Sequence, residues 1–196
     1  RLKFCGTFNG NGFVVNNLIL FYNPNYENFE SFFGNLYGAR IENVVLRHVY
    51  SEGRNESDGK FFGSADPFET GSEMRQNVID RCYVEIDEMH KDGANRESAL
   101  FGFKNDGVIT NCMVRCGKLT YPNHYCEPEG LFVWYNFGSI KNCASVADSL
   151  KWMSKYGGLA IENHGLIENC YSYIGDWFGD YACYWPPTPR MGVAEG

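Results

Sequence analysis

The sequence lacks any surplus of basic residues, because 17 Lys and Arg stand against 24 Asp and Glu, for a formal net charge of -7. Phosphate backbones and anionic lipid surfaces repel a chain of this charge, so we expect no nucleic-acid partner. It also lacks any apolar run long enough to cross a bilayer, and we expect no membrane insertion.

Catalytic signatures are missing as well. The chain holds no phosphate-cradling glycine loop, no H-E-x-x-H, no G-x-S-x-G and no paired C-x-x-C. Its 4 histidines are scattered along the sequence. We therefore name no catalytic residues, expect no metal and no cofactor, and favour a protein that is not an enzyme.

Helical periodicity is absent over any useful length, whereas Tyr, Phe and Gly are abundant, with 13, 15 and 22 copies among 196 residues. Aromatic residues and glycines suit strands and turns, so the composition predicts an all-β fold. The length fits one domain spanning 1–196. The chain opens on Arg1, without Met, inside a strand-like pattern, and we expect it to be a fragment of a longer polypeptide.

A repeat organises the chain. It is clearest in the stretches 99–114, 130–145 and 158–172, where an apolar residue precedes an Ile by eight positions. An Asn-x-Gly triplet lies between them, and Asn-Cys follows the Ile by two. When the copies are aligned on the Ile, the repeat extends to earlier parts of the chain. We call the residue at the Ile position of each copy its anchor; the anchors are Val15, Ile41, Ile79, Ile109, Ile140 and Ile167.

These anchors are spaced 26, 38, 30, 31 and 27 residues apart. Each unit is too short to bury its own apolar face and must stack on its neighbours. We predict a right-handed parallel β-helix of about six coils, with three short strands in each coil. The coils would occupy 1–174, and the aromatic, proline-rich stretch 175–196 would form a C-terminal cap or tail.

Equivalent positions in stacked coils form ladders along the axis. One predicted ladder is polar and places asparagine at a corner, where its side chain tolerates left-handed backbone: Asn43, Asn111, Asn142 and Asn169, with Arg81 as an exception. The other is apolar and points inward: Cys82, Cys112, Cys143 and Cys170. Cys116 and Cys126 flank a loop and could pair in an oxidising compartment.

Three interruptions are expected in the repeat. An excursion is predicted around Asp66 to Arg75, because Phe62-Gly63 matches Phe101-Gly102 but lies too far from its Ile. Polar loops are predicted at 87–97 and 117–129.

The opening stretch 4–20 and the later units, such as Leu100-Phe101-Gly102 with Asn105, Gly107, Ile109 and Asn111, resemble the GLUG-repeat proteins. This resemblance implies a right-handed parallel β-helix in a secreted or surface-anchored protein, such as a bacterial adhesin. Val133 and Ala160 depart from the motif glycine, and Arg81 departs from its asparagine. The family shares no catalytic residues, so the resemblance implies none here.

Aromatic residues concentrate in the C-terminal half and give the best functional lead, because aromatic faces stack on sugar rings and anchor protein interfaces. The residues proposed to bind a ligand are Tyr121, His124, Tyr125, Trp134, Tyr135, Trp152 and Tyr156. The alternative is that these rings simply pack against the body of the solenoid.

The sequence therefore favours an extracellular or cell-surface binding module for a glycan or a protein, of unknown oligomeric state. Two alternatives stay open. One is a polysaccharide lyase or hydrolase beside the loop 117–129, and the other is a purely structural stalk or viral spike segment.

Overall fold

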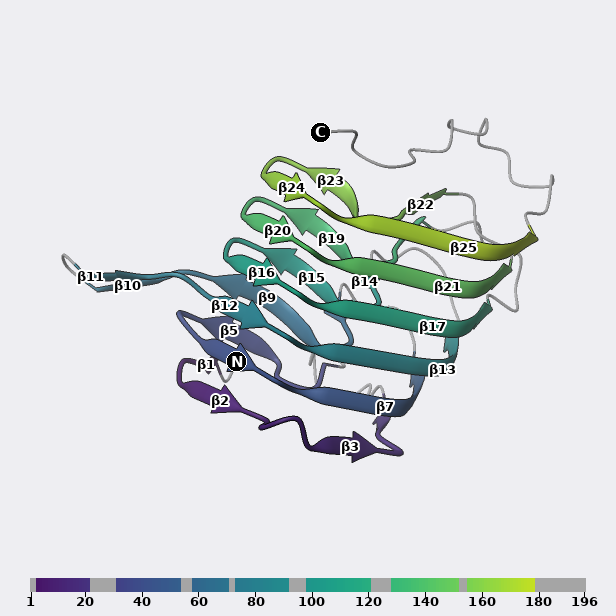
Figure 1. The fold of residues 1–196 in the computed structure, drawn as a ribbon, viewed down its shortest axis with the longest axis horizontal. Coiled ribbons are helices and arrows are strands. Elements are labelled where there is room, and N and C mark those ends of the chain that lie inside the picture. The colour runs from purple at the N-terminus through teal and green to yellow at the C-terminus, as the bar shows by residue number, and fades with distance from the viewer. Residues whose placement is uncertain are drawn as a thin grey trace.

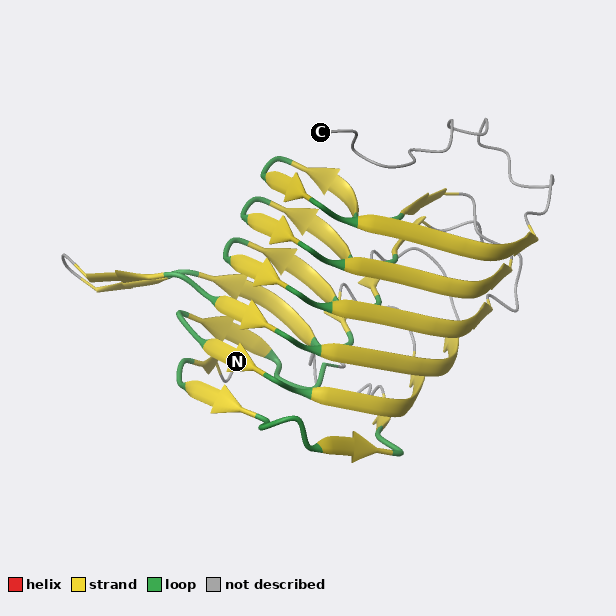
Figure 2. Cartoon of the chain, viewed as in Figure 1, coloured by secondary structure: helices red, strands yellow, loops and turns green. Residues whose placement is uncertain are grey.

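A computed structural model describes residues 3–21, 31–53, 58–70, 73–91, 98–120, 128–151 and 155–178. The described residues form only strands and loops, with no helix among them. Figure 2 shows the strands stacked one above another. Short loops join them at the same corner of each coil. The chain is a parallel β-solenoid, as its repeat predicts.

Two sheets of six short strands run the length of the solenoid (Figure 1). The first, sheet A, consists of β1 (Lys3–Phe4), β5 (Asn35–Tyr37), β9 (Phe62–Asp66), β15 (Gly102–Asn105), β19 (Val133–Asn136) and β23 (Ala160–Asn163). The second, sheet B, consists of β2 (Thr7–Asn9), β6 (Arg40–Glu42), β12 (Val78–Asp80), β16 (Val108–Thr110), β20 (Ser139–Lys141) and β24 (Leu166–Glu168).

Sheet C holds the longest strands: β3 (Val14–Asn16), β7 (Val45–Gly53), β13 (Tyr83–Lys91), β17 (Met113–Thr120), β21 (Ala144–Lys151) and β25 (Tyr171–Phe178), with β4 (Ile19–Phe21) also pairing to β7. Sheet D is small: β8 (Asp58–Gly59), β14 (Ser98–Ala99), β18 (Pro128–Gly130) and β22 (Lys155–Gly157). A complete turn therefore has four strands, not the predicted three. About four turns contribute to all four sheets.

Five of the six predicted anchors of the repeat are confirmed as equivalent positions in successive coils. Ile41, Ile79, Ile109, Ile140 and Ile167 pair in register along sheet B. The first anchor is wrong, because Ile41 pairs with Phe8, whereas Val15 pairs with Leu46 in sheet C. The pattern favours Val15 because Asn17 follows it by two positions, whereas Gly10 stands at that place after Phe8.

Phenylalanine rings fill the core beside sheet A. The rings of Phe61 and Phe101 stack with centroids 4.9 Å apart, and those of Phe101 and Phe132 with centroids 4.7 Å apart. Phe61 is thus the equivalent of Phe101, not Phe62 as predicted; Phe62 pairs with Gly102. A β-carbon on Gly102 would lie 2.0 Å from the Phe62 ring, so a side chain here would require that ring to move.

The predicted excursion is confirmed. It is an antiparallel hairpin of β10 (Phe68–Thr70) and β11 (Glu73–Arg75), which leaves the body of the solenoid at the corner between sheets A and B (Figure 1). The two predicted polar loops begin too early, because β13 continues to Lys91 and β17 to Thr120. Both stretches pair in register with strands of the neighbouring coils. This pairing outweighs the tendency of their polar residues to form loops. Of the proposed cap, only the residues to Phe178 are described, and these extend β25.

Candidate functional site

The corner between sheets B and C carries the predicted asparagine ladder. Asn43, Asn111, Asn142 and Asn169 adopt left-handed backbone with φ of 54, 55, 53 and 51°, and Arg81 does so with φ of 52°. The amide of Asn142 donates to Oδ1 of Asn111 at 3.3 Å, and that of Asn43 to Oδ1 of Asn9 at 3.0 Å. This ladder satisfies backbone geometry at the turn, so its role is structural.

The cysteine that follows each corner lies in or beside the core as a free thiol. The sulfurs of Cys112, Cys143 and Cys170 each accept the backbone N–H of the cysteine one coil earlier, beginning with that of Cys82, at 3.4, 3.4 and 3.3 Å. Burial raises the pKa of the Cys112 thiol well above its ordinary value, so this thiol stays protonated. Cys116 is also buried, and Cys126 lies outside the described residues, so the pairing of these two cysteines stays a prediction.

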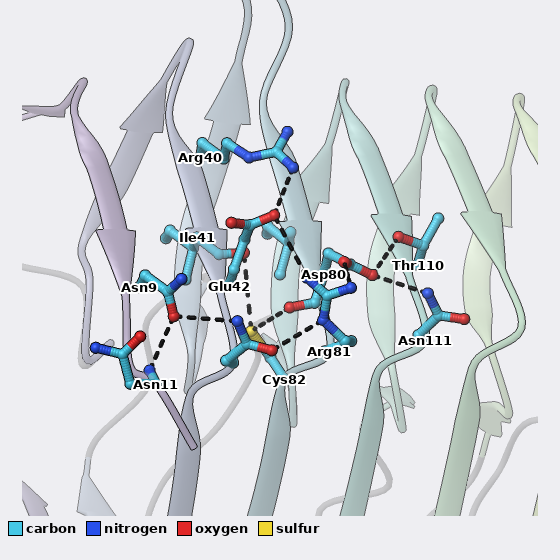
Figure 3. A network of polar contacts seen from close by, with 12 residues as sticks. Asn9, Asn11, Arg40, Ile41, Glu42, Asp80, Arg81, Cys82, Thr110 and Asn111 are labelled. Atoms are coloured by element: carbon cyan, nitrogen blue, oxygen red, sulfur yellow. Dashed lines mark hydrogen bonds and ion pairs between the residues drawn. The ribbon is translucent and has the colours of Figure 1, made fainter. Parts of the chain in front are cut away.

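A polar network surrounds Arg81, the residue that interrupts the asparagine ladder (Figure 3). Its Nε donates to Oδ1 of Asn43 at 2.8 Å, and its guanidinium pairs with Asp80 at 3.1 Å and with Glu42 at 3.7 Å. Glu42 also pairs with Arg40. Arg81 therefore replaces one rung of the ladder with ion pairs that bind neighbouring coils together.

Asp80 is the most interconnected carboxylate of this network. It accepts from Thr110 Oγ1 and from Asn111 Nδ2, both at 2.8 Å. Partial burial alone would raise its pKa, but these two hydrogen bonds and the charges of Arg81 and Arg40 hold the pKa below the ordinary 3.8. An ionised carboxylate of this kind stabilises the fold and is poorly suited to act as a general acid.

We expect Asp80→Asn to lower the free energy of unfolding at pH 7 by about 1–2 kcal/mol, because charge-assisted hydrogen bonds are lost. Since the folded pKa lies below the unfolded one, the stabilisation by Asp80 is present above about pH 4 and is lost as pH falls through the folded pKa. Urea melts of both proteins between pH 2 and 7 should converge in acid. A difference that is independent of pH would contradict this account.

A second asparagine ladder, which the sequence did not lead us to expect, lies at the corner between sheets A and B. It is buried at Asn105 and Asn136 and exposed at Asn163. Asn105 donates to Asn136 at 2.8 Å, and Asn136 donates to Asn163 at 2.7 Å. The Oδ1 of Asn105 also accepts the N–H of Gly107, which closes the turn. The signal in the sequence was the Asn-x-Gly triplet, which recurs in phase with the isoleucine.

These asparagines hold the middle residue of each triplet outward, in a row. The row consists of Asp106, Phe137 and His164, on three consecutive coils. Two positions before each lies an outward residue of sheet A, giving a parallel row of Lys104, Tyr135 and Glu162 in register. We call these six side chains the turn array.

The centre of the turn array is aromatic. The Phe137 and His164 rings stack at 4.9 Å with an interplanar angle of 9°, and those of Tyr135 and Phe137 stack at 6.2 Å and 21°. Phe137 is 46% exposed. With coils about 4.8 Å apart, the three coils span about 10 Å. The array thus offers an accessible ring surface on a rigid backbone.

Charged groups flank the rings. Lys104 pairs with Asp106 at 2.5 Å and with Asp66 at 3.2 Å, and its Nζ lies 5.6 Å from the centre of the Phe137 ring. Burial would lower the pKa of Lys104, but its hydrogen bonds to both aspartates raise the pKa above its ordinary value. His164 lies 3.6 Å from Glu162. The array therefore combines an apolar centre with hydrogen-bonding groups at both ends.

Of the residues predicted to bind a ligand, Tyr135 belongs to the turn array. Trp134 is 3% exposed, which corrects its proposed role, because a buried indole offers no face to a ligand. Tyr156 is half-buried on β22, in sheet D, and the structure does not bring it into the array. Tyr121, His124, Tyr125 and Trp152 lie outside the described residues. Phe137 and His164 were missed, because nothing in the sequence marks the middle of the triplet as outward.

No family model, no curated protein and no solved structure matches this chain. The part of the chain that the structure describes has no group of three or more His, Cys, Asp or Glu placed to hold a metal ion. Nor does that part contain a helix long and apolar enough to cross a membrane.

Proposed function

We propose that this chain is a non-enzymatic binding module, secreted or displayed at a cell surface, that holds a glycan against the turn array. The observation that carries the proposal is the stacked surface of Tyr135 and Phe137 on one coil and His164 on the next. Flat aromatic faces bind the apolar faces of sugar rings, and the polar groups at either end can hydrogen-bond to hydroxyls.

Several finer features belong to the same proposal. We propose a right-handed solenoid of six coils, similar to the GLUG-repeat proteins, that ends in a C-terminal cap over 179–196, beyond β25. A glycoside hydrolase needs a carboxylic acid that stays protonated near neutral pH. The lowered pKa of Asp80 favours the opposite state, so the polar network of sheet B lends no support to that alternative.

The test is a glycan-array screen of the wild-type chain beside Phe137→Ala and Tyr135→Ala. We expect binding to a defined oligosaccharide, weakened at least tenfold by Phe137→Ala, because the central ring of the array is lost. Tyr173→Ala is the matched control, since Tyr173 is a 59% exposed tyrosine on sheet C, outside the array.

Three results would count against the proposal. Absence of binding across the screen would favour a stalk segment or a protein ligand. Binding that both array variants retain would place the glycan elsewhere. Cleavage of the arrayed glycan would show an enzyme.

A further inference from the structure

A second candidate site lies at the hairpin, away from the turn array. The base of the hairpin packs closely on β5: Phe68 contacts Tyr37 with ring centroids 5.1 Å apart. Gly38 makes this approach possible, because it has φ of 60° and a β-carbon there would lie 2.4 Å from Cβ of Phe68. The guanidinium of Arg75 is held 4.4 Å from the centre of the Phe68 ring. The hairpin is therefore fixed at its base.

Between the hairpin and the first turns of the solenoid lies an open cleft of about 680 Å³, within the range of small-molecule sites. Its chemistry is mixed. Arg40 and Arg75 bring charge, Thr7 and Gln76 bring neutral hydrogen-bonding groups, and Met74 brings apolar surface.

The charged residues that line the cleft are both basic, and Glu42 beside the lining pairs with one of them, Arg40. None of the described residues that line the cleft is acidic, whereas the chain carries a net charge of -7. Arg40 pairs with Glu42 and Arg75 lies over the Phe68 ring, so both guanidinium groups are positioned before any ligand arrives. A guanidinium has five N–H donors in a planar fork, which matches carboxylate and sulfate oxygens.

We propose that this cleft binds an oxyanion carried by a saccharide, either the carboxylate of a uronic acid or a sulfate ester. The two arginines recognise the anion, Thr7 and Gln76 hydrogen-bond to hydroxyls, and Met74 packs on a ring face. The proposal does not rest on the turn array, which lies on other coils and on the other side of the hairpin (Figure 1).

Cys5 provides a probe of the cleft, because it is an exposed thiol that lines it. The experiment measures alkylation of Cys5 by iodoacetamide, followed on its peptide by mass spectrometry. It is run with trigalacturonate, with sulfated cellotriose and with unmodified cellotriose. Cys116 is buried and serves as the internal control, since its labelling reports unfolding.

We expect one of the two anionic oligosaccharides to slow Cys5 alkylation at least fivefold, and the one that does so identifies the anion. Unmodified cellotriose should have no effect. Equal protection by all three, or protection by none, would overturn the proposal.

Variants test the role of the arginines. Arg75→Gln should raise the ligand concentration needed for half-maximal protection at least tenfold, and Arg75→Lys should have an intermediate effect, because it keeps the charge and loses the fork. Arg115→Gln is the matched control, an exposed arginine paired with Asp148 on sheet C. Phe137→Ala should leave Cys5 protection unchanged, which separates this proposal from the turn array. Protection that survives Arg75→Gln would overturn it.

Discussion

Replacing Asn136 with alanine is expected to lower the free energy of unfolding by about 3 kcal/mol. Asn136 is 0% exposed and forms the middle rung of the second asparagine ladder. Its removal leaves the buried amide of Asn105 without its acceptor, whereas Asn163 is exposed to water and keeps the N–H of Gly165. Buried polar groups that lose their partners cost the full penalty of desolvation, which is why the effect exceeds that of one ordinary hydrogen bond.

Urea denaturation followed by circular dichroism measures this effect, and two variants sharpen it. Asn136→Leu restores volume without hydrogen bonds and should be no more stable than the alanine variant. Asn142→Ala removes an exposed rung with a single longer bond of 3.3 Å and should cost only about 1 kcal/mol. Rescue by leucine would show that packing, not hydrogen bonding, makes the second asparagine ladder important.

Replacing Phe101 with alanine is expected to have the largest effect, a loss of about 3–5 kcal/mol. Phe101 is fully buried and stacks on both Phe61 and Phe132, so truncation opens a cavity between three coils. In a solenoid each coil contacts only its neighbours, so the core cannot easily collapse around the gap.

The matched control makes the same substitution on the outer surface. Phe137→Ala removes a ring that also stacks across coils, but one that is half-exposed, and should cost about 1 kcal/mol or less. The comparison uses thermal and urea melts of both variants. Equal losses would mean that the turn array is a structural ladder rather than a surface available for binding.

The sequence was informative where a residue type repeats at an inward position. Isoleucine and cysteine recur in phase because each coil needs the same buried volume at the same place. The recurrence of isoleucine alone predicts the register of sheet B from Ile41 to Ile167. The pattern failed at the first coil, where Phe8 fills the isoleucine position and Val15 does not. Substitution of one large apolar residue for another keeps the packing and hides the repeat.

The candidate site was less predictable, because its residues occupy positions at which the fold tolerates any side chain. Asp106, Phe137 and His164 share a place between an asparagine and a glycine but no chemistry, so no pattern marks them. The concentration of aromatic residues predicted Tyr135 as a ligand-binding residue. It also predicted Trp134, whose burial the sequence does not reveal. Which rings face the solvent depends on the backbone geometry of the corner between sheets A and B, and only the structure shows that geometry.

The most direct test of the central claim is an affinity measurement by titration calorimetry, with the oligosaccharide that binds best. It compares the wild-type chain with Phe137→Ala and Tyr173→Ala. The account predicts that Phe137→Ala weakens binding at least tenfold, or about 1.4 kcal/mol, while its unfolding curve stays close to that of the wild type. Tyr173→Ala should bind like the wild type. Equal affinity for all three proteins would contradict a binding role for the turn array.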